Sequence, residues 1–166
     1  MKRICYLPLM FLIISCSSQT TQGSEITIIP DTEATLIAMS PSLEITFDGN
    51  ECKFNGENEI TIGEHVFLLH NQSGHKSFII VGRLYTEKRW DDYLQWFEDE
   101  CGPPGSSASG CEPPWVSWPF PVKSTDQGLD KHYSQYNLNL EAEYLFVVES
   151  DGGWWPCNTF QVVAAK

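Results

Sequence analysis

The segment Leu138–Lys166 reads LNLEAEYLFVVESDGGWWPCNTFQVVAAK, and it decides the fold class. Two runs rich in β-branched and aromatic residues, Ala142–Glu149 and Asn158–Ala165, flank the turn-and-aromatic segment Ser150–Cys157. The first run is apolar on both faces, which suits a strand that is buried on one side and partly covered on the other. Because proline has no amide hydrogen, we expect Pro156 to interrupt the sheet and the last strand to restart after it.

The chain before this segment alternates short apolar runs with turn signals. The expected strands are Glu25–Ile29, Glu33–Met39, Leu43–Phe47, Cys52–Phe54, Glu59–Ile62, His65–His70, Ser77–Leu84 and His132–Leu140. Short strands at such intervals predict an all-β sandwich or barrel. With 166 residues, the chain is long enough for one such domain and an export segment.

One stretch, about residues 86–125, has a different pattern and is predicted to be an insertion into the sandwich. Four aromatic or apolar side chains recur there at the spacing of one helix face: Trp90, Tyr93, Leu94 and Phe97. We expect this helix to span Thr86–Glu98, with Thr86 as its N-cap. Gly102–Val122 then holds six of the ten prolines and predicts a long loop, which is either functional or a cover over the core.

The N-terminus has the three parts of a signal peptide, assigned to residues 1–15: two cations, an apolar run and small polar residues. The sequence Ile-Ile-Ser-Cys at its end resembles a bacterial lipobox, which implies cleavage before Cys16 and a lipid on its sulfur. The alternative is ordinary secretion, with Cys16 as an incidental thiol. Residues 16–24 are predicted to be a flexible tether and residues 25–166 the folded domain.

The charge of the chain restricts its partners. The formal net charge is −12, and removal of the two cations in residues 1–15 makes the mature chain more acidic still. Nucleic acid needs Lys and Arg to displace its counterions, so a nucleic-acid partner is excluded. Anionic lipid headgroups also repel such a chain, so attachment to a membrane has to come from the lipid anchor.

Of the six cysteines, Cys5 lies in the signal peptide and Cys16 at the predicted lipid site. An even number remains in the exported domain: Cys52, Cys101, Cys111 and Cys157. In an oxidising compartment this favours two disulfides, for which three connectivities exist. We favour Cys52–Cys157, which ties an early strand to the last one, and Cys101–Cys111, which closes a short loop. A structural zinc site is the alternative, but the chain has no C-x2-C pair.

Three segments, in this order, resemble the cupredoxins. Ile60–Asn71 (ITIGEHVFLLHN) resembles a strand of that family, Gln72–Phe78 (QSGHKSF) the loop with its first copper histidine near His75, and Leu140–Phe146 (LEAEYLF) the strand that enters the copper loop. Together with FDGNECKFNG, PPWVSW and WWPCNTFQVV, they resemble uncharacterised bacterial extracytoplasmic proteins with a copper-less cupredoxin-like domain. Over about residues 43–165, the resemblance implies a Greek-key β-sandwich with a helix-plus-proline-rich loop insertion.

The copper ligands of that family are not matched. A type 1 copper site needs two imidazoles and a thiolate in a trigonal arrangement. The family's copper cysteine falls near Val148, no histidine or methionine follows it, and Cys157 is assigned to a disulfide. We therefore expect no type 1 centre and no cofactor. His75 and His132 are candidates for a different metal site, and the alternative is that they are ordinary surface or half-buried histidines.

The chain contains no G-x-S-x-G, H-E-x-x-H or phosphate-loop motif, and its thiols are assigned to disulfides. The remaining functional candidates are tryptophans on the proline-rich loop and near the last turn: Trp115, Trp118, Trp154 and Trp155. They are candidates for a stacking surface that holds a sugar or a partner's side chain. The favoured interpretation is that the insertion folds over that end of the domain and buries them.

These observations predict a lipid-anchored, extracytoplasmic β-sandwich in the cell envelope. It is expected to be a non-enzymatic binding module for an unknown protein or glycan partner. The alternatives are a copper- or other metal-handling protein of the cell envelope, and a carbohydrate-binding surface made of the tryptophans.

Overall fold

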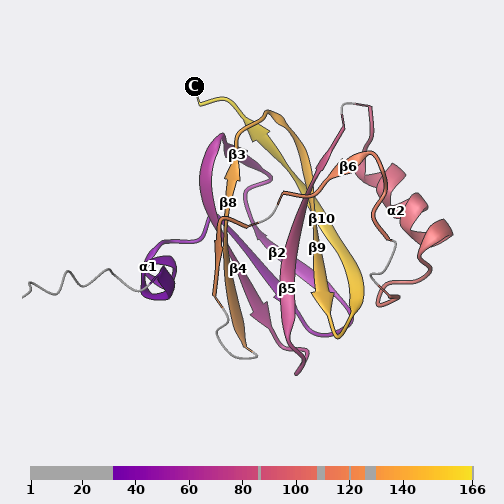
Figure 1. Ribbon diagram of the computed structural model, residues 1–166, viewed down its shortest axis with the longest axis horizontal. Helices are drawn as coiled ribbons and strands as arrows, with labels where there is room; N and C mark the ends of the chain where they lie inside the picture. Colours follow the sequence, from indigo (N-terminus) through magenta and orange to yellow (C-terminus); the bar gives the residue numbers. More distant parts are fainter. Residues whose placement is uncertain (1–31, 86, 108–110, 120, 126–129, 166) are drawn as a thin grey trace, which may run out of the picture.

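The computed structural model describes residues 32–85, 87–107, 111–119, 121–125 and 130–165. The expected signal peptide, tether and first strand (Glu25–Ile29) lie outside these residues, as do Cys16 and Thr86. The described part of the chain folds into two sheets that face each other (Figure 1). None of its helices is long and apolar enough to cross a membrane.

Among the described residues, each sheet has five strands. The first sheet contains, in spatial order, β2 (Cys52–Gly56), β1 (Leu43–Phe47), β4 (Gly63–Asn71), β8 (Lys131–Leu138) and β7 (Lys123–Ser124). The second sheet contains β3 (Glu59–Thr61), β10 (Gly153–Val163), β9 (Ala142–Ser150), β5 (Ser77–Leu84) and β6 (Val116–Ser117). Neighbouring strands are antiparallel, except that β1 runs parallel to β4 and β3 parallel to β10. The prediction of an all-β sandwich is confirmed.

The core fills the space between the two sheets. Alternate residues of each strand point inward, because successive side chains of a strand lie on opposite faces. Fully buried inward side chains include Ile45, Phe67, Val81, Phe146 and Phe160. Burial of each such side chain stabilises the fold by roughly 1.5–3 kcal/mol. A hydrogen bond also joins the sheets, since the hydroxyl of Tyr136 on β8 donates to the backbone carbonyl of Ile79 on β5 at 2.9 Å.

A helix covers the outer face of each sheet (Figure 1). Helix α1 (Thr32–Ala38) buries Leu36 against Val66, Leu68 and Tyr133 of the first sheet. Helix α2 (Trp90–Glu100) buries Tyr93 and Phe97 in a cluster with side chains of the second sheet: Leu84, Leu145, Val147 and Trp154.

The prediction of a strand at Glu33–Met39 was wrong, because this segment forms α1. Glutamate, alanine and leucine favour a helix, and a short apolar run does not separate helix from strand by its periodicity alone. A seven-residue helix is marginal in isolation, so the burial of Leu36 is what holds α1 in place.

The insertion contains the expected helix, but at α2 (Trp90–Glu100) instead of Thr86–Glu98. The backbone N–H of Arg89 donates to the carboxylate of Asp92 at 2.9 Å, which starts the helix. Its buried face is rotated from the predicted one: Trp96 packs partly buried against the cluster, while Leu94 is 39% exposed.

The expectation that Pro156 interrupts the last strand was wrong as well. β10 starts at Gly153 and continues through Pro156, with a register shift against β9 between Pro156 and Asn158. The proline is tolerated because β3 pairs only with Gln161–Val163, so this half of β10 has a strand on one side alone in the described part of the chain.

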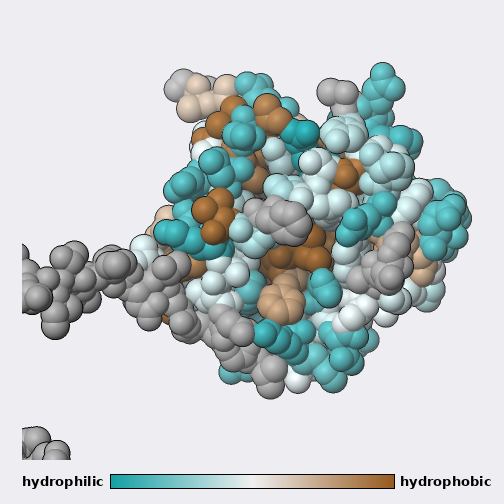
Figure 2. Space-filling view, viewed as in Figure 1, coloured by the Kyte–Doolittle hydropathy of each residue, from teal (hydrophilic) through white to brown (hydrophobic). Residues whose placement is uncertain are grey.

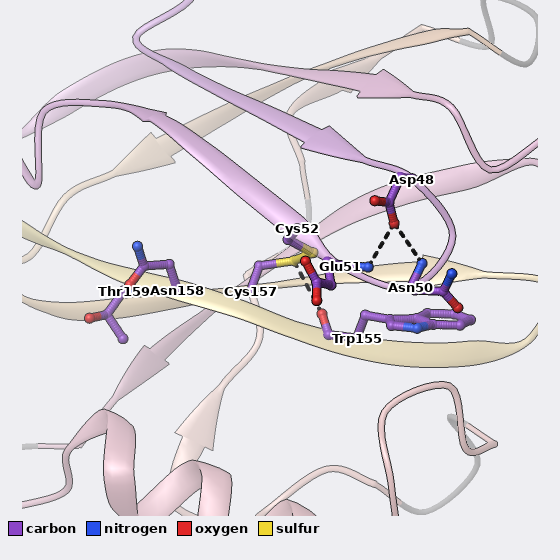
Figure 3. The surroundings of a disulfide bond; sticks show 8 residues. All are labelled: Asp48, Asn50, Glu51, Cys52, Trp155, Cys157, Asn158 and Thr159. Atoms are coloured by element: carbon purple, nitrogen blue, oxygen red, sulfur yellow. Dashed lines mark hydrogen bonds between the residues drawn. A yellow bond between two sulfur atoms is a disulfide. The ribbon is translucent and has the colours of Figure 1, made fainter.

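The structure contains both expected disulfides, Cys52–Cys157 and Cys101–Cys111. The first joins β2 of the first sheet to β10 of the second (Figure 3). Beside it, the carboxylate of Asp48 accepts the backbone N–H groups of Asn50 and Glu51, both at 2.9 Å. The second disulfide joins the end of α2 to the proline-rich loop.

Candidate functional site

A cleft opens at the side of the sandwich where β5 of the second sheet faces β8 of the first. We call it the inter-sheet cleft. β6 pairs with β5 only at Arg83 and Leu84, so Phe78–Ile80 pair with β9 on one side and have no described strand on the other. The cleft has a volume of about 310 Å³, at the lower end of the roughly 300–1,000 Å³ typical of small-molecule sites. Figure 2 shows hydrophobic atoms gathered between β8 and β5, with hydrophilic residues around them.

Two tryptophans from distant parts of the chain meet in this cleft. Trp118 and Trp154 both line it, with ring centroids 5.3 Å apart and planes inclined by 60°. Such an edge-on arrangement is favoured by the charge distribution of aromatic rings. Trp154 is only 4% exposed.

The backbone of Trp154 is held on both sides. Within β10 it pairs with Glu149 of β9. On its other side, its carbonyl accepts the N–H of Gly105 at 2.7 Å, and its own N–H donates to the carbonyl of Ser106 at 3.1 Å. The proline-rich loop therefore acts as a further edge to β10 at this point.

Trp118 is positioned by β6 and by a glycine on the neighbouring strand. A Cβ atom at Gly82 would lie 2.6 Å from Cγ1 of Val116 and 2.8 Å from the ring of Trp118. Such distances are shorter than van der Waals contact, so the approach of Trp118 to β5 requires glycine at this position.

Three side-chain polar atoms on residues that line the cleft are buried and have no hydrogen-bond partner in the described structure: Nε1 of Trp118, Nε1 of Trp154 and Oγ of Ser134. Ser134 lies on β8 and is 0% exposed. A buried polar group without a partner costs about 1–3 kcal/mol, and native proteins keep few of them. The two other described side-chain atoms of this kind, Tyr93 OH and Gln135 Oε1, belong to residues that do not line the cleft.

The charged residues that line the cleft are acidic, while Lys76 lies outside the lining, with its Nζ 5.2 Å from the centroid of the Phe78 ring. Glu112 is exposed and Glu149 partly buried at its lining, whereas no described lining residue is Lys or Arg. His132 is buried there, with its ring edge-on to Phe78 at a centroid distance of 5.0 Å. The rest of the lining is mainly apolar, so the site combines apolar contact with indole N–H donors, a hydroxyl and carboxylate acceptors.

The four candidate tryptophans do not form one surface. Trp118 and Trp154 come together in the cleft. Trp115 lies half-buried beside α2, where its ring contacts those of Tyr93 and Trp96. Trp155 packs against the inter-sheet core, 5.1 Å from the ring of Phe47.

The structure gives the two candidate metal ligands different surroundings. His75 is exposed, with Nδ1 3.9 Å from a carboxylate oxygen of Asp151, whereas His132 is buried in the cleft. Val148, near the expected position of a copper cysteine, is fully buried in the core, and Cys157 is disulfide-bonded. Within the residues described, no three His, Cys, Asp or Glu side chains are grouped to hold a metal ion.

A second hollow of about 410 Å³ lies beside β3 and is more open. His65 lines it, and both ring nitrogens already have partners: Nδ1 lies 2.9 Å from Oγ of Ser42, and Nε2 lies 2.6 Å from the carbonyl oxygen of Thr61. No unpartnered buried side-chain atom lines it in the described structure. The inter-sheet cleft is therefore the better candidate.

Sequence reasoning placed Trp118 and Trp154 among its candidates but missed Ser134 and Glu149. The signal for Ser134 was present, because the alternation within His132–Leu140 puts this serine on the same face as Tyr136. Glu149 lines the cleft only because the packed sheets and the proline-rich loop bring their edges together there, which no local pattern reveals.

No protein-family model matches the chain, and no curated protein does. Among solved structures, an uncharacterized protein from Bacillus anthracis str. Ames is similar over 71% of this chain and 83% of that chain, with 9% identity and a TM-score of 0.38. A similarity at this level carries no argument about function.

Proposed function

We propose that the protein is a lipid-anchored β-sandwich of the cell envelope that binds a small molecule in the inter-sheet cleft without transforming it. The observation that carries the proposal is the group of unpartnered buried atoms on Trp118, Trp154 and Ser134. These atoms are covered in the ligand-free structure, so a ligand bonds to them only when the side chains around them move. Once bonded, it removes their desolvation cost, so these atoms favour an occupied cleft over an empty one.

The two disulfides indicate an oxidising, extracytoplasmic environment. In that setting, the lipobox-like sequence before Cys16 supports attachment through a lipid. Mass measurement of the intact protein from membranes tests this part: acylated Cys16 is expected, and an unmodified thiol there contradicts it.

We also propose a cupredoxin-like Greek-key topology without type 1 copper ligands, as in the bacterial lipoproteins that the sequence resembles. Two pairings support it, because each joins strands distant in sequence: β1 with β4 in the first sheet, and β5 with β9 in the second. Connections that pass from one sheet to the other and return are typical of Greek-key sandwiches.

The residues of the cleft support ligand binding better than they support catalysis. General acid–base or nucleophilic chemistry needs a nucleophile held against a base. The described lining offers one imidazole, His132, whose ring packs edge-on against Phe78. All four cysteines of the domain are disulfide-bonded.

A thermal-shift screen of small molecules tests the proposal. A ligand present at 100 times its Kd stabilises the folded state by about 2.7 kcal/mol. Ser134→Leu fills the cleft and is expected to abolish the shift, while Ser42→Leu, the matched change in the other hollow, is expected to keep it. The proposal fails if no compound stabilises the wild type, or if Ser134→Leu folds and responds like the wild type.

A further inference from the structure

We infer that the ligand of the inter-sheet cleft is an uncharged, hydroxyl-rich ring: a neutral sugar of one or two residues. This inference rests on the proposed function, because it presupposes that the cleft is a binding site. It assigns roles to Trp118, Trp154, Ser134 and Glu149.

The hydrogen-bonding groups of the cleft match a ligand that both accepts and donates hydrogen bonds. An indole N–H only donates, so Trp118 and Trp154 need acceptor oxygens on the ligand. A carboxylate only accepts, so Glu149 and Glu112 can bond only to donor groups of a ligand. Hydroxyl groups satisfy both demands from adjacent positions on one ring, and the hydroxyl of Ser134 can serve either way.

The charges argue against an ionic ligand. Glu112 and Glu149 repel a carboxylate or phosphate, and no described lining residue is Lys or Arg. The ammonium of Lys76, beside the lining, is over the ring of Phe78, 5.2 Å from its centroid. An ammonium group would pair with the carboxylates, but it has no lone pair for the N–H groups of Trp118 and Trp154. An uncharged ligand with acceptor oxygens is not repelled by the carboxylates and can accept hydrogen bonds from the indole N–H groups.

The shape and lining agree with a ring that has an apolar face. Phe78, Ile80 and Pro119 give the cleft an apolar side, against which the C–H face of a sugar can pack. The volume of about 310 Å³ limits the ligand to a small one.

Calorimetric titration of the full domain tests the inference. The panel contains glucose, galactose, mannose, N-acetylglucosamine and their common disaccharides, with glucuronate as the anionic and glucosamine as the cationic counterpart. We expect at least one neutral sugar to bind, and the matching charged sugar to bind about tenfold or more weakly. Trp118→Phe and Trp154→Phe should each weaken binding about tenfold, about 1.4 kcal/mol, because each removes one N–H donor and keeps an aromatic ring. Trp115→Phe, which lies outside the cleft, is expected to bind as the wild type does.

Three outcomes overturn the inference. Charged or non-sugar compounds could be the only ones whose binding is abolished by Ser134→Leu. In that case the inference fails and the proposed function stands. If no compound of any class binds, both fail. If a neutral sugar binds equally well to the folded Trp118→Phe and Trp154→Phe variants, it binds elsewhere, and the inference fails. Saturation-transfer NMR on the wild type decides whether a sugar binds even where a variant does not fold.

Discussion

The hydroxyl of Ser134 is expected to favour ligand binding and to lower the stability of the ligand-free protein. This hydroxyl is buried and has no partner in the described structure. Ser134→Ala removes an unsatisfied polar group, so we expect the free energy of unfolding of the ligand-free protein to stay the same or rise by about 1 kcal/mol. Urea denaturation measures this change, and ligand affinity is expected to fall in the same variant.

Ser150→Ala is the matched control. Its hydroxyl is also buried, but it accepts a hydrogen bond from Oγ of Ser77 at 2.8 Å. This variant is expected to lose about 1 kcal/mol of unfolding free energy. A similar loss in Ser134→Ala would mean that the hydroxyl of Ser134 has a partner, which contradicts the account of the cleft.

Asp48 gives a pH dependence whose sign follows from its hydrogen bonds. The backbone N–H groups of Glu51 and Asn50 stabilise the carboxylate and lower the pKa of Asp48 below its ordinary value of 3.8. The folded state therefore binds fewer protons than the unfolded state near this pH, and stability falls as the pH falls through the lowered pKa. Asp48→Ala should be less stable than the wild type above pH 5, with a difference that shrinks at lower pH. Thermal unfolding from pH 2 to 7 measures it, and a pH-independent difference contradicts this assignment.

At the residue scale, the sequence predicted which side chains are paired and which are aromatic candidates, but not their orientation. Cysteine number and the export signal predicted two disulfides but left three connectivities open, and the structure has the favoured one. Trp154 and Trp155 are adjacent in one strand and so point to opposite faces, one into the cleft and one toward the core. From the sequence, Ser150–Cys157 was assigned to a turn-and-aromatic segment, so this alternation was not predicted.

Substitution of Gly82 tests whether the position of β6 and Trp118 depends on close packing against β5. Gly82→Ala puts a methyl group against Val116 and Trp118, so β6 has to shift away from β5. We expect a cost of about 1–3 kcal/mol in unfolding free energy, together with weaker ligand binding, because Trp118 moves. Ser117→Ala, on β6, is the control and should change both little. Chemical denaturation and calorimetry measure the two effects.

At the element scale, strands with clear alternation and bounded by turn signals were predicted well. β1 and β5 have the predicted bounds, Leu43–Phe47 and Ser77–Leu84. The errors at α1 and Pro156 share a cause, because each depends on a tertiary neighbour. Leu36 docks on the first sheet, and Pro156 is tolerated because this half of β10 has a described strand, β9, on one side only. Neither neighbour is visible in the local sequence.

For the whole molecule, the two disulfides are expected to contribute unequally. Cys52–Cys157 closes a loop with a sequence separation of 105 and Cys101–Cys111 one of 10. The chain-entropy model gives about 4–5 kcal/mol for the first and about 2–3 kcal/mol for the second. Replacing both cysteines of a pair by alanine and measuring equilibrium denaturation tests this order. Equal losses, or a larger loss for the short loop, would contradict it.

The sandwich itself was predictable from the sequence because strand periodicity is local, whereas the cleft was not. The cleft exists because β6 is too short to cover β5, and because Trp118 and Trp154 meet there from positions far apart in the chain. These are properties of the packed molecule, and so is the burial of the three unpartnered atoms.

The most direct test of the binding cleft is the indole N–H spectrum of the 15N-labelled protein, with its six tryptophans assigned by Trp→Phe variants. On titration with a neutral sugar that binds, the indole resonances of Trp118 and Trp154 are predicted to move together and saturate at one equivalent. Those of Trp96 and Trp115, which lie outside the cleft, are predicted to stay in place. Saturable movement of other indoles, with Trp118 and Trp154 unchanged, would contradict the assignment of the cleft as the binding site.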